Sequence, residues 1–196
     1  LREGDERARC LAVYVLGGRG ETKAEETLIL LVSSDDSLAV RRFAIEALAK
    51  LKSKKAEEII RATLKNSRLR TTAIDALAEI GEESSLEELT EYLTDPDWRV
   101  RQHVIRSIAK IGGTQLIPQL VVVLGEDKIG NVRAECAEAL GHLGAQETVE
   151  PIIKALKDPH EAVRRKAARA LGILNNSPSI APLSDAFHEE KSFLVK

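Results

Sequence analysis

The sequence predicts an all-α protein, a right-handed α–α superhelix of about six stacked helical hairpins. Three observations lead to this fold class. The 196 residues include 24 Ala and 25 Leu, and both are strong helix formers. Apolar residues recur with helical spacing. A segment of about 31 residues repeats along the chain, and stacked copies of such a unit bury a core that one copy cannot bury alone.

The repeat is clearest where the first helix of each copy ends. In a degenerate first copy, the first helix ends at Val13 to Gly17. In the later copies the first helix ends on an apolar residue, and these end residues are spaced by 29, 31, 32 and 31 residues. Four of these end residues precede Gly or Asn, which tolerate the left-handed conformation that closes a helix. The end residues are Leu51, Ile80, Ile111, Leu143 and Leu174, and the closing residues are Gly81, Gly112, Gly144 and Asn175.

The start of each first helix carries a recurring Asp, an apolar residue and an Arg. The Asp lies five residues before the apolar residue, and in two copies Pro96 or Pro159 follows it. Asp followed by Pro is typical of an N-cap and the first helical position, so we expect the helix to begin there. The Asp residues are Asp35, Asp95, Asp127 and Asp158, and the Arg residues are Arg41, Arg70, Arg101, Arg133 and Arg164.

A second helix fits between each closing Gly and the next Asp. Val149, Ile152, Ile153 and Leu156 form one apolar stripe at i, i+3, i+4 and i+7, as in an amphipathic helix. Small residues such as Ala47 on the first helices favour close packing between copies. We expect one domain over residues 1–196, as a fragment of a longer chain, with repeats at 5–33, 35–65, 66–94, 95–125, 127–157 and 158–190.

Composition excludes several classes of protein. Aliphatic runs such as Leu28 to Val32 have five residues, whereas a membrane span needs about twenty, so we expect no membrane partner. Lys and Arg number 29 against 31 Asp and Glu, a balance that argues against binding a polyanion. No secretory signal is visible. Cys10 and Cys136 each lie in an apolar helical pattern, so we expect free thiols and a cytoplasmic location.

The best-formed copy carries a family resemblance. Residues 158–172, from Asp158-Pro159 through Val163-Arg164 to Leu171-Gly172, together with Val149 to Leu156 before them, resemble the short HEAT repeat named after phycobilisome lyases. The resemblance covers nearly the whole chain. It implies a HEAT-like solenoid, and it says little about function because the shared residues are those that build the fold.

Enzymes with this repeat suggest tests on particular residues. The deoxyhypusine hydroxylases are understood to hold two iron ions with His-Glu pairs placed directly after the Val-Arg of several repeats. Those slots here hold other residues, among them Ala134-Glu135 and Arg165-Lys166, while His160-Glu161 and His188-Glu189 are out of register. We therefore expect no metal, no cofactor and no catalytic residue.

Two other precedents remain. Phycobilin lyases are thought to hold a tetrapyrrole and its acceptor protein on one surface, and a lyase-like or chaperone-like helper that presents a cofactor is our alternative function. HEAT-like DNA glycosylases use a basic concave surface, whereas the second helices here carry many carboxylates. We therefore expect no nucleic acid as a partner. The carboxylates are those of Glu21, Glu25, Glu26, Glu57, Glu58, Glu87, Glu88, Glu91, Glu147 and Glu150.

The recurring Arg has two interpretations. One Arg per repeat beside a recurring Asp fits a ladder of ion pairs between repeats, which is a structural role. The same arginines could instead bind an acidic partner. The first interpretation predicts that replacing Arg133 lowers stability more than binding.

Residues that break the amphipathic rule indicate a binding surface. Eight of the nine residues from Leu116 to Leu124 are apolar or Pro, more than one stripe can hold, so one or two of Leu116, Val121, Val122 and Val123 should face the concave surface. Tyr92 and Trp98 flank the turn between repeats three and four, and large aromatics are frequent binding anchors. Packing between layers is the other interpretation of each residue.

Our main expectation is a non-enzymatic scaffold. It binds a protein or peptide segment on the concave face through Tyr92, Trp98, Leu116, Val121 and Val122. The last copy stays apolar at Phe187 and Phe193 to Val195, where a terminal repeat is usually polar. We therefore expect the solenoid ends to continue in the native protein or to contact another chain.

Overall fold

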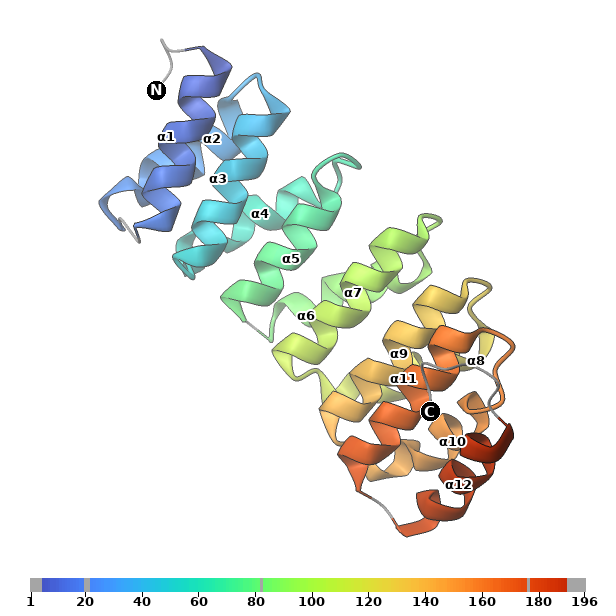
Figure 1. Cartoon of the computed structure of the whole chain (residues 1–196). Helices are drawn as coiled ribbons and strands as arrows, with labels where there is room; N and C mark the ends of the chain where they lie inside the picture. The colour runs from blue at the N-terminus through green and yellow to red at the C-terminus, as the bar shows by residue number, and fades with distance from the viewer. Residues whose placement is uncertain (1–4, 20–21, 82, 176, 190–196) are drawn as a thin grey trace. The chain divides into compact units, whose positions relative to one another are not determined.

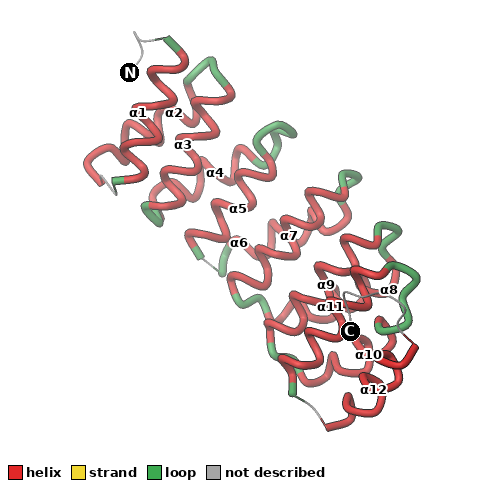
Figure 2. The backbone as a smooth tube through the Cα atoms, in the orientation of Figure 1, coloured by secondary structure: helices red, strands yellow, loops and turns green. Residues whose placement is uncertain are grey.

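The structure is a computed structural model that describes residues 5–19, 22–81, 83–175 and 177–189. All regular structure in these ranges is helical (Figure 2). The predicted all-α fold class is therefore confirmed, and the described helices form stacked helical hairpins. Contacts between residues divide the chain into two compact units, residues 1–85 and 86–196. That the hairpins form one continuous domain stays a prediction.

Unit 1 contains the first two hairpins and the first helix of the third. The helix α3 (Leu38–Lys50) packs between α1 (Glu6–Gly18) and α5 (Arg70–Ile80), which places these first helices in one layer (Figure 1). The second helices α2 (Glu25–Ser34) and α4 (Glu57–Thr63) contact each other in a second layer. Leu28, Ile45, Leu48 and Ile60 are fully buried between the layers.

Unit 2 begins within α6 (Ser85–Glu91) and repeats the two-layer arrangement. The helix α9 (Gly130–Leu143) lies between α7 (Trp98–Ile111) and α11 (Glu161–Leu174). The second helices are α8 (Ile117–Glu126), α10 (Val149–Ala155) and α12 (Ile180–Glu189), of which α8 and α10 contact each other. Ile105, Leu120 and Leu140 form part of its buried core.

The predicted helix ends are confirmed. Gly81, Gly112, Gly144 and Asn175 close α5, α7, α9 and α11 with φ values of 81°, 87°, 71° and 46°. These are left-handed conformations, which Gly adopts without steric cost and Asn tolerates. Each closing residue releases the chain into the turn that leads to a second helix.

The predicted N-caps are wrong. The helix α7 is capped by Asp97, whose side chain accepts the Arg99 N–H at 2.9 Å, and not by Asp95. Asp95 lies two residues earlier and accepts the Asp97 N–H at 2.8 Å, which is an Asx-turn. Asp35, Asp127 and Asp158 make the same turn. The physical reason is that the turns of Asp35, Asp127 and Asp158 hold the carboxylate toward the preceding repeat, where an Arg binds it.

In the described ranges, no helix is both long and apolar enough to cross a bilayer. The cytoplasmic location stays a prediction. Cys10 is half-buried and Cys136 is buried, and both thiols are free. Phe193 to Val195 and Glu21 lie outside the described residues, as do the side chains of Phe187 and His188.

Candidate functional site

The recurring Arg and Asp join neighbouring hairpins inside each unit. In unit 2, Arg101 Nε and Nη2 donate to the two carboxylate oxygens of Asp127 at 2.7 and 2.9 Å. Arg133 binds Asp158 in the same way at 2.7 and 2.8 Å. These bidentate pairs lie largely out of solvent, where charge-assisted hydrogen bonds are strong. The predicted ion pairs between repeats are therefore confirmed for Arg101 and Arg133. Three other arginines of the predicted ladder donate to backbone carbonyls: Arg41 to Val32, Arg70 to Leu64 and Arg164 to Asp158.

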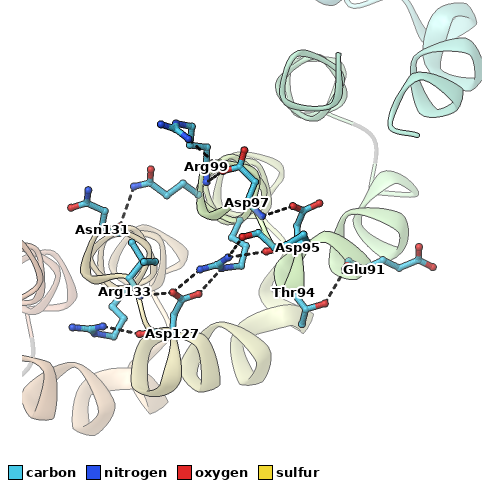
Figure 3. Close-up of polar contacts among 12 residues, drawn as sticks. Glu91, Thr94, Asp95, Asp97, Arg99, Asp127, Asn131 and Arg133 are labelled. Atoms are coloured by element: carbon cyan, nitrogen blue, oxygen red, sulfur yellow. Dashed lines mark hydrogen bonds and ion pairs between the residues drawn. The ribbon is translucent and has the colours of Figure 1, made fainter. Parts of the chain in front are cut away.

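Asp127 shows how one residue links three segments (Figure 3). Its carboxylate accepts hydrogen bonds from Arg101 and from the Ile129 N–H, while its backbone carbonyl accepts Arg133 Nη1 at 2.7 Å. Burial alone would raise the pKa of Asp127, but these hydrogen bonds and the nearby positive charges outweigh it and lower the pKa below its usual value. The pKa of Asp158 is lowered for the same reasons.

The ladder also includes a residue that the sequence reasoning missed. In unit 1, Arg9 Nε and Nη2 donate to Asp35 at 3.0 and 3.2 Å. The sequence marker for the start of each first helix was a large apolar residue followed by Arg. In the first copy the residue before Arg9 is Ala8, which does not match this marker. Arg9 lies 32 residues before Arg41, so the repeat spacing was the signal that could have found it.

The α8 and α10 helices of unit 2 enclose a groove with a cavity volume of about 320 Å³. Val121, Leu124 and Pro151 form its apolar part. Lys154, on α10, also lines the groove and is exposed to solvent. Next to Val121, the side chain of Val122 is 53% exposed. We call this surface the α8–α10 groove. It is lined by Val121, Leu124, Gly125, Pro151, Lys154, Ala155 and Asp158.

The five predicted partner-binding residues do not all meet there. Val121 lines the groove and Val122 is exposed beside it. Leu116 is 7% exposed in the turn before α8 and packs into the core instead. Tyr92 and Trp98 are half-buried and are not among the lining residues, and the Trp98 ring stacks with the Arg99 guanidinium at 4.8 Å. That these five residues bind a partner stays a prediction.

A metal centre of the hydroxylase type does not fit the described residues. Within the part of the chain that the structure describes, no group of three or more His, Cys, Asp or Glu side chains could hold a metal ion. His160 is the N-cap of α11, and its ring packs against Gly130, where an added Cβ would lie 2.4 Å from the ring. Its position is therefore explained by packing.

The thiols do not provide a nucleophile in the groove. Burial raises the pKa of Cys136 well above its usual value, with smaller contributions from Asp127 and Glu135. Burial also raises the pKa of Cys10, on α1 in unit 1. A protonated thiol is a poor nucleophile, and neither Cys lines the α8–α10 groove.

The sequence of this chain is similar to those of known proteins. The family description of HEAT repeats matches residues 1–71, 59–130 and 117–196. The phycocyanobilin lyase subunit alpha of a Picosynechococcus species is 32% identical over 114 residues, which cover 53% of this chain and 42% of the lyase subunit. A deoxyhypusine hydroxylase of Aspergillus clavatus is 36% identical over 89 residues, covering 44% of this chain and 27% of the hydroxylase.

Among solved structures, the complex of CpcE and CpcF of phycocyanin lyase from Nostoc contains a similar chain. The TM-score is 0.65 at 22% identity, covering 97% of this chain and 79% of that chain. This likeness shows the fold. The matches span less than half the length of the curated relatives.

These comparisons correct the expectation that the chain is not an enzyme. The matching relatives are a lyase subunit and several hydroxylases, and they point to enzymatic or lyase activity. The physical reason for the error is that the repeat pattern records how hairpins stack. A solenoid that catalyses a reaction and one that only binds a partner share those stacking residues.

Proposed function

The chain belongs to the HEAT-repeat family, and on this premise we propose that it is a phycobilin-lyase-like protein that holds a linear tetrapyrrole for an acceptor protein. One observation carries the proposal: the 32% identity with a phycocyanobilin lyase subunit over 53% of the chain. Deoxyhypusine hydroxylases match up to 52% of this chain, but the described residues lack a cluster that could hold a metal ion.

The α8–α10 groove supports a tetrapyrrole as the substrate. A bilin combines flat apolar rings with two propionate groups, so its site needs an apolar surface and a cation. Val121, Leu124 and Pro151 offer the apolar surface, and Lys154 offers the cation. The volume of about 320 Å³ lies at the small end for ligand pockets. A bilin would therefore lie partly exposed, over Val122, within reach of an acceptor.

The chemistry of the thiols supports a non-covalent hold on the bilin. Cys136 is buried, and neither Cys10 nor Cys136 is among the residues that line the groove. In our proposal the acceptor protein supplies the nucleophile. The groove keeps the bilin extended and oriented until the acceptor arrives, which reduces the entropic cost of the transfer.

The proposal includes a protein partner. The relative is named as a subunit, and the match spans less than half of it. We therefore assign this chain the bilin-holding part of the activity and expect transfer to require a second lyase chain.

Titration of the purified chain with phycocyanobilin tests the proposal. We expect a saturable change in the visible absorption and fluorescence of the bilin. Lys154→Glu removes the exposed ion pair that we propose between Lys154 and a bilin propionate. It should weaken bilin binding about two- to five-fold. Val121→Asp places a charge in the apolar part and should weaken binding more strongly.

The control variant is Lys65→Glu, which makes the same charge change at an exposed position in unit 1. It should bind bilin like the wild type. Covalent bilin on apo-phycocyanin, scored on denaturing gels with and without a second lyase chain, tests transfer. Absence of bilin binding, or equal weakening by Lys65→Glu and Lys154→Glu, would contradict the proposed site.

A further inference from the structure

The ladder lacks a carboxylate at one position inside unit 1. In the pairs described above, the Asp follows its Arg by 25 or 26 residues. These pairs are Arg9 with Asp35, Arg101 with Asp127 and Arg133 with Asp158. The residue 25 positions after Arg41 is Asn66. The register of the ladder therefore places a neutral amide where the other pairs have a carboxylate.

Asn66 keeps the backbone turn of the ladder and changes only its chemistry. Its Oδ1 accepts the Arg68 N–H at 3.0 Å, which is the Asx-turn that Asp127 makes with the Ile129 N–H at 2.8 Å. The other carboxylate oxygen of Asp127, Oδ2, accepts a hydrogen bond from Arg101. The corresponding atom of Asn66 is Nδ2, which donates hydrogen bonds and accepts none.

Arg41 shows the consequence of this exchange. Its Nε donates to the Val32 carbonyl at 2.7 Å, whereas Arg133 uses Nε for a carboxylate. Among the residues that the structure describes, none accepts a hydrogen bond or forms an ion pair with the two Nη atoms of Arg41. Arg41 and Asn66 are both half-buried, so a ligand can reach them from solvent.

We propose that Arg41 and Asn66 form a binding site for a carboxylate group that comes from outside this chain. The two Nη atoms of Arg41 form a planar fork, which donates two parallel hydrogen bonds to a carboxylate, and Asn66 Nδ2 supplies a further donor. The ligand is a free carboxylic acid or an Asp or Glu side chain of another polypeptide. This inference does not rest on the proposed function.

Two observations favour a carboxylate over a phosphate. The ladder itself shows that its arginines bind carboxylates, because Arg9, Arg101 and Arg133 each hold one with two hydrogen bonds. One guanidinium also balances the single charge of a carboxylate, whereas a phosphate monoester brings about two negative charges. The site lies within unit 1, where α3 packs against α5, so both of its residues come from neighbouring hairpins of one compact unit.

Nuclear magnetic resonance titration of the full chain with acetate tests the proposal. Acetate replaces chloride at constant ionic strength, and the signals of Arg41 Nε–H and Asn66 Nδ2–H report binding. We expect saturable shifts with a dissociation constant on the order of millimolar, as for a single small group. Arg41→Lys keeps the charge and loses the fork, so acetate should shift the Asn66 signal with about three- to ten-fold weaker affinity.

Asn66→Asp supplies the missing carboxylate from within the chain. It should pair with Arg41, raise the urea midpoint of the full chain and remove the acetate-dependent shift of Arg41. The rise in midpoint should be absent when Asn66→Asp is made together with Arg41→Ala, because the pair then cannot form. Asn131→Asp makes the same change at an exposed position of unit 2, and it should leave acetate binding at Arg41 unchanged.

A blocked peptide with one Asp, and the same peptide with Asn, distinguish the two sources of the carboxylate. Binding of the Asp peptide assigns the site to a polypeptide side chain, and binding of acetate without the Asp peptide assigns it to a free acid. The Asn peptide should cause no shift. The proposal is overturned if neither acetate nor the Asp peptide shifts Arg41, if the shift persists in Asn66→Asp, or if inorganic phosphate binds and both carboxylates do not.

Discussion

Asp158 joins two hairpins through a single carboxylate, so its pair with Arg133 is a point at which stability can be tested. The two bonds are 2.7 and 2.8 Å long, and the side chains are 13% and 11% exposed. Arg133→Ala leaves the carboxylate partly buried without its strongest donor. The free energy of unfolding should fall by about 1–3 kcal/mol, as measured by urea denaturation.

Arg99→Ala is the matched control for this change. Arg99 is 66% exposed and lies 3.8 Å from Asp97, and exposed pairs of this kind contribute little. Its loss should stay within about 0.5 kcal/mol. Equal losses for Arg99→Ala and Arg133→Ala would contradict a structural role for the ladder. Bilin binding should be unchanged in Arg99→Ala.

The same carboxylates predict how stability depends on pH. The pKa values of Asp127 and Asp158 are lowered in the folded chain because hydrogen bonds and positive charges outweigh the effect of burial. The unfolded chain therefore binds more protons in mild acid. This stabilisation is complete above the unfolded pKa, near 3.9, and is lost as pH falls through the lower folded pKa.

Urea denaturation between about pH 7 and pH 3 measures this dependence. The wild type should begin to lose stability below about pH 5 and should lose it most steeply below about pH 4. Asp127→Asn and Asp158→Asn should be less stable at pH 7 and should show a shallower dependence on pH. Parallel curves for the wild type and both variants would show that these carboxylates do not cause the acid sensitivity.

Glycines at one repeat position have opposite roles in two neighbouring helices. Gly141 on α9 lies against α11, and an added Cβ would be 2.7 Å from the Cβ and 2.8 Å from the Cα of Ala170. Gly172, at the same position of α11, has open space around it. Gly141→Ala should therefore force the two helices apart and cost about 1–3 kcal/mol.

Gly172→Ala should instead stabilise the chain by up to about 1 kcal/mol, because Ala restricts the unfolded chain and favours the helix. Thermal and urea denaturation of the two variants beside the wild type measures both effects. Changes of the same sign in both variants would contradict the packing described for α9 and α11. The far-ultraviolet circular dichroism of Gly172→Ala should match that of the wild type.

The helices α5, α7, α9 and α11 were predictable because each is marked twice, by its apolar stripe and by its closing residue. Gly112 or Asn175 ends a helix for local reasons, so one sequence reveals it. The role of Asp35 and Asp127 depended on a partner about 26 residues away, and local N-cap statistics gave the wrong result. Leu116 illustrates the same limit, because an apolar run does not say which of its members the neighbouring hairpin buries.

At the scale of the whole molecule, the repeat fixes the fold and leaves function open. Val121 and Val122 stood out because they exceed what one apolar stripe can hold, and they do lie at or beside the α8–α10 groove. That Lys154 lines the groove was not predictable, since an exposed Lys on a helix is ordinary. The similarity to a lyase subunit came from comparison with other proteins.

The division into two compact units predicts that a destabilising substitution in one unit has little effect on the other. In repeat proteins stability is a sum of local terms and nearest-neighbour interfaces. Gly17 lies against Ala47 in unit 1, so Gly17→Leu should separate α1 from α3. Amide hydrogen exchange of the full chain should then quicken in α1–α3 and change little in α9–α11.

Urea unfolding followed by two probes tests the same prediction. Trp98, the single tryptophan, lies in unit 2. In Gly17→Leu, the fluorescence of Trp98 should keep the wild-type urea midpoint, while circular dichroism should show helix loss at a lower urea concentration. Gly141→Leu should reverse this pattern. Coincident shifts of both probes in both variants would show that the chain unfolds as one cooperative body.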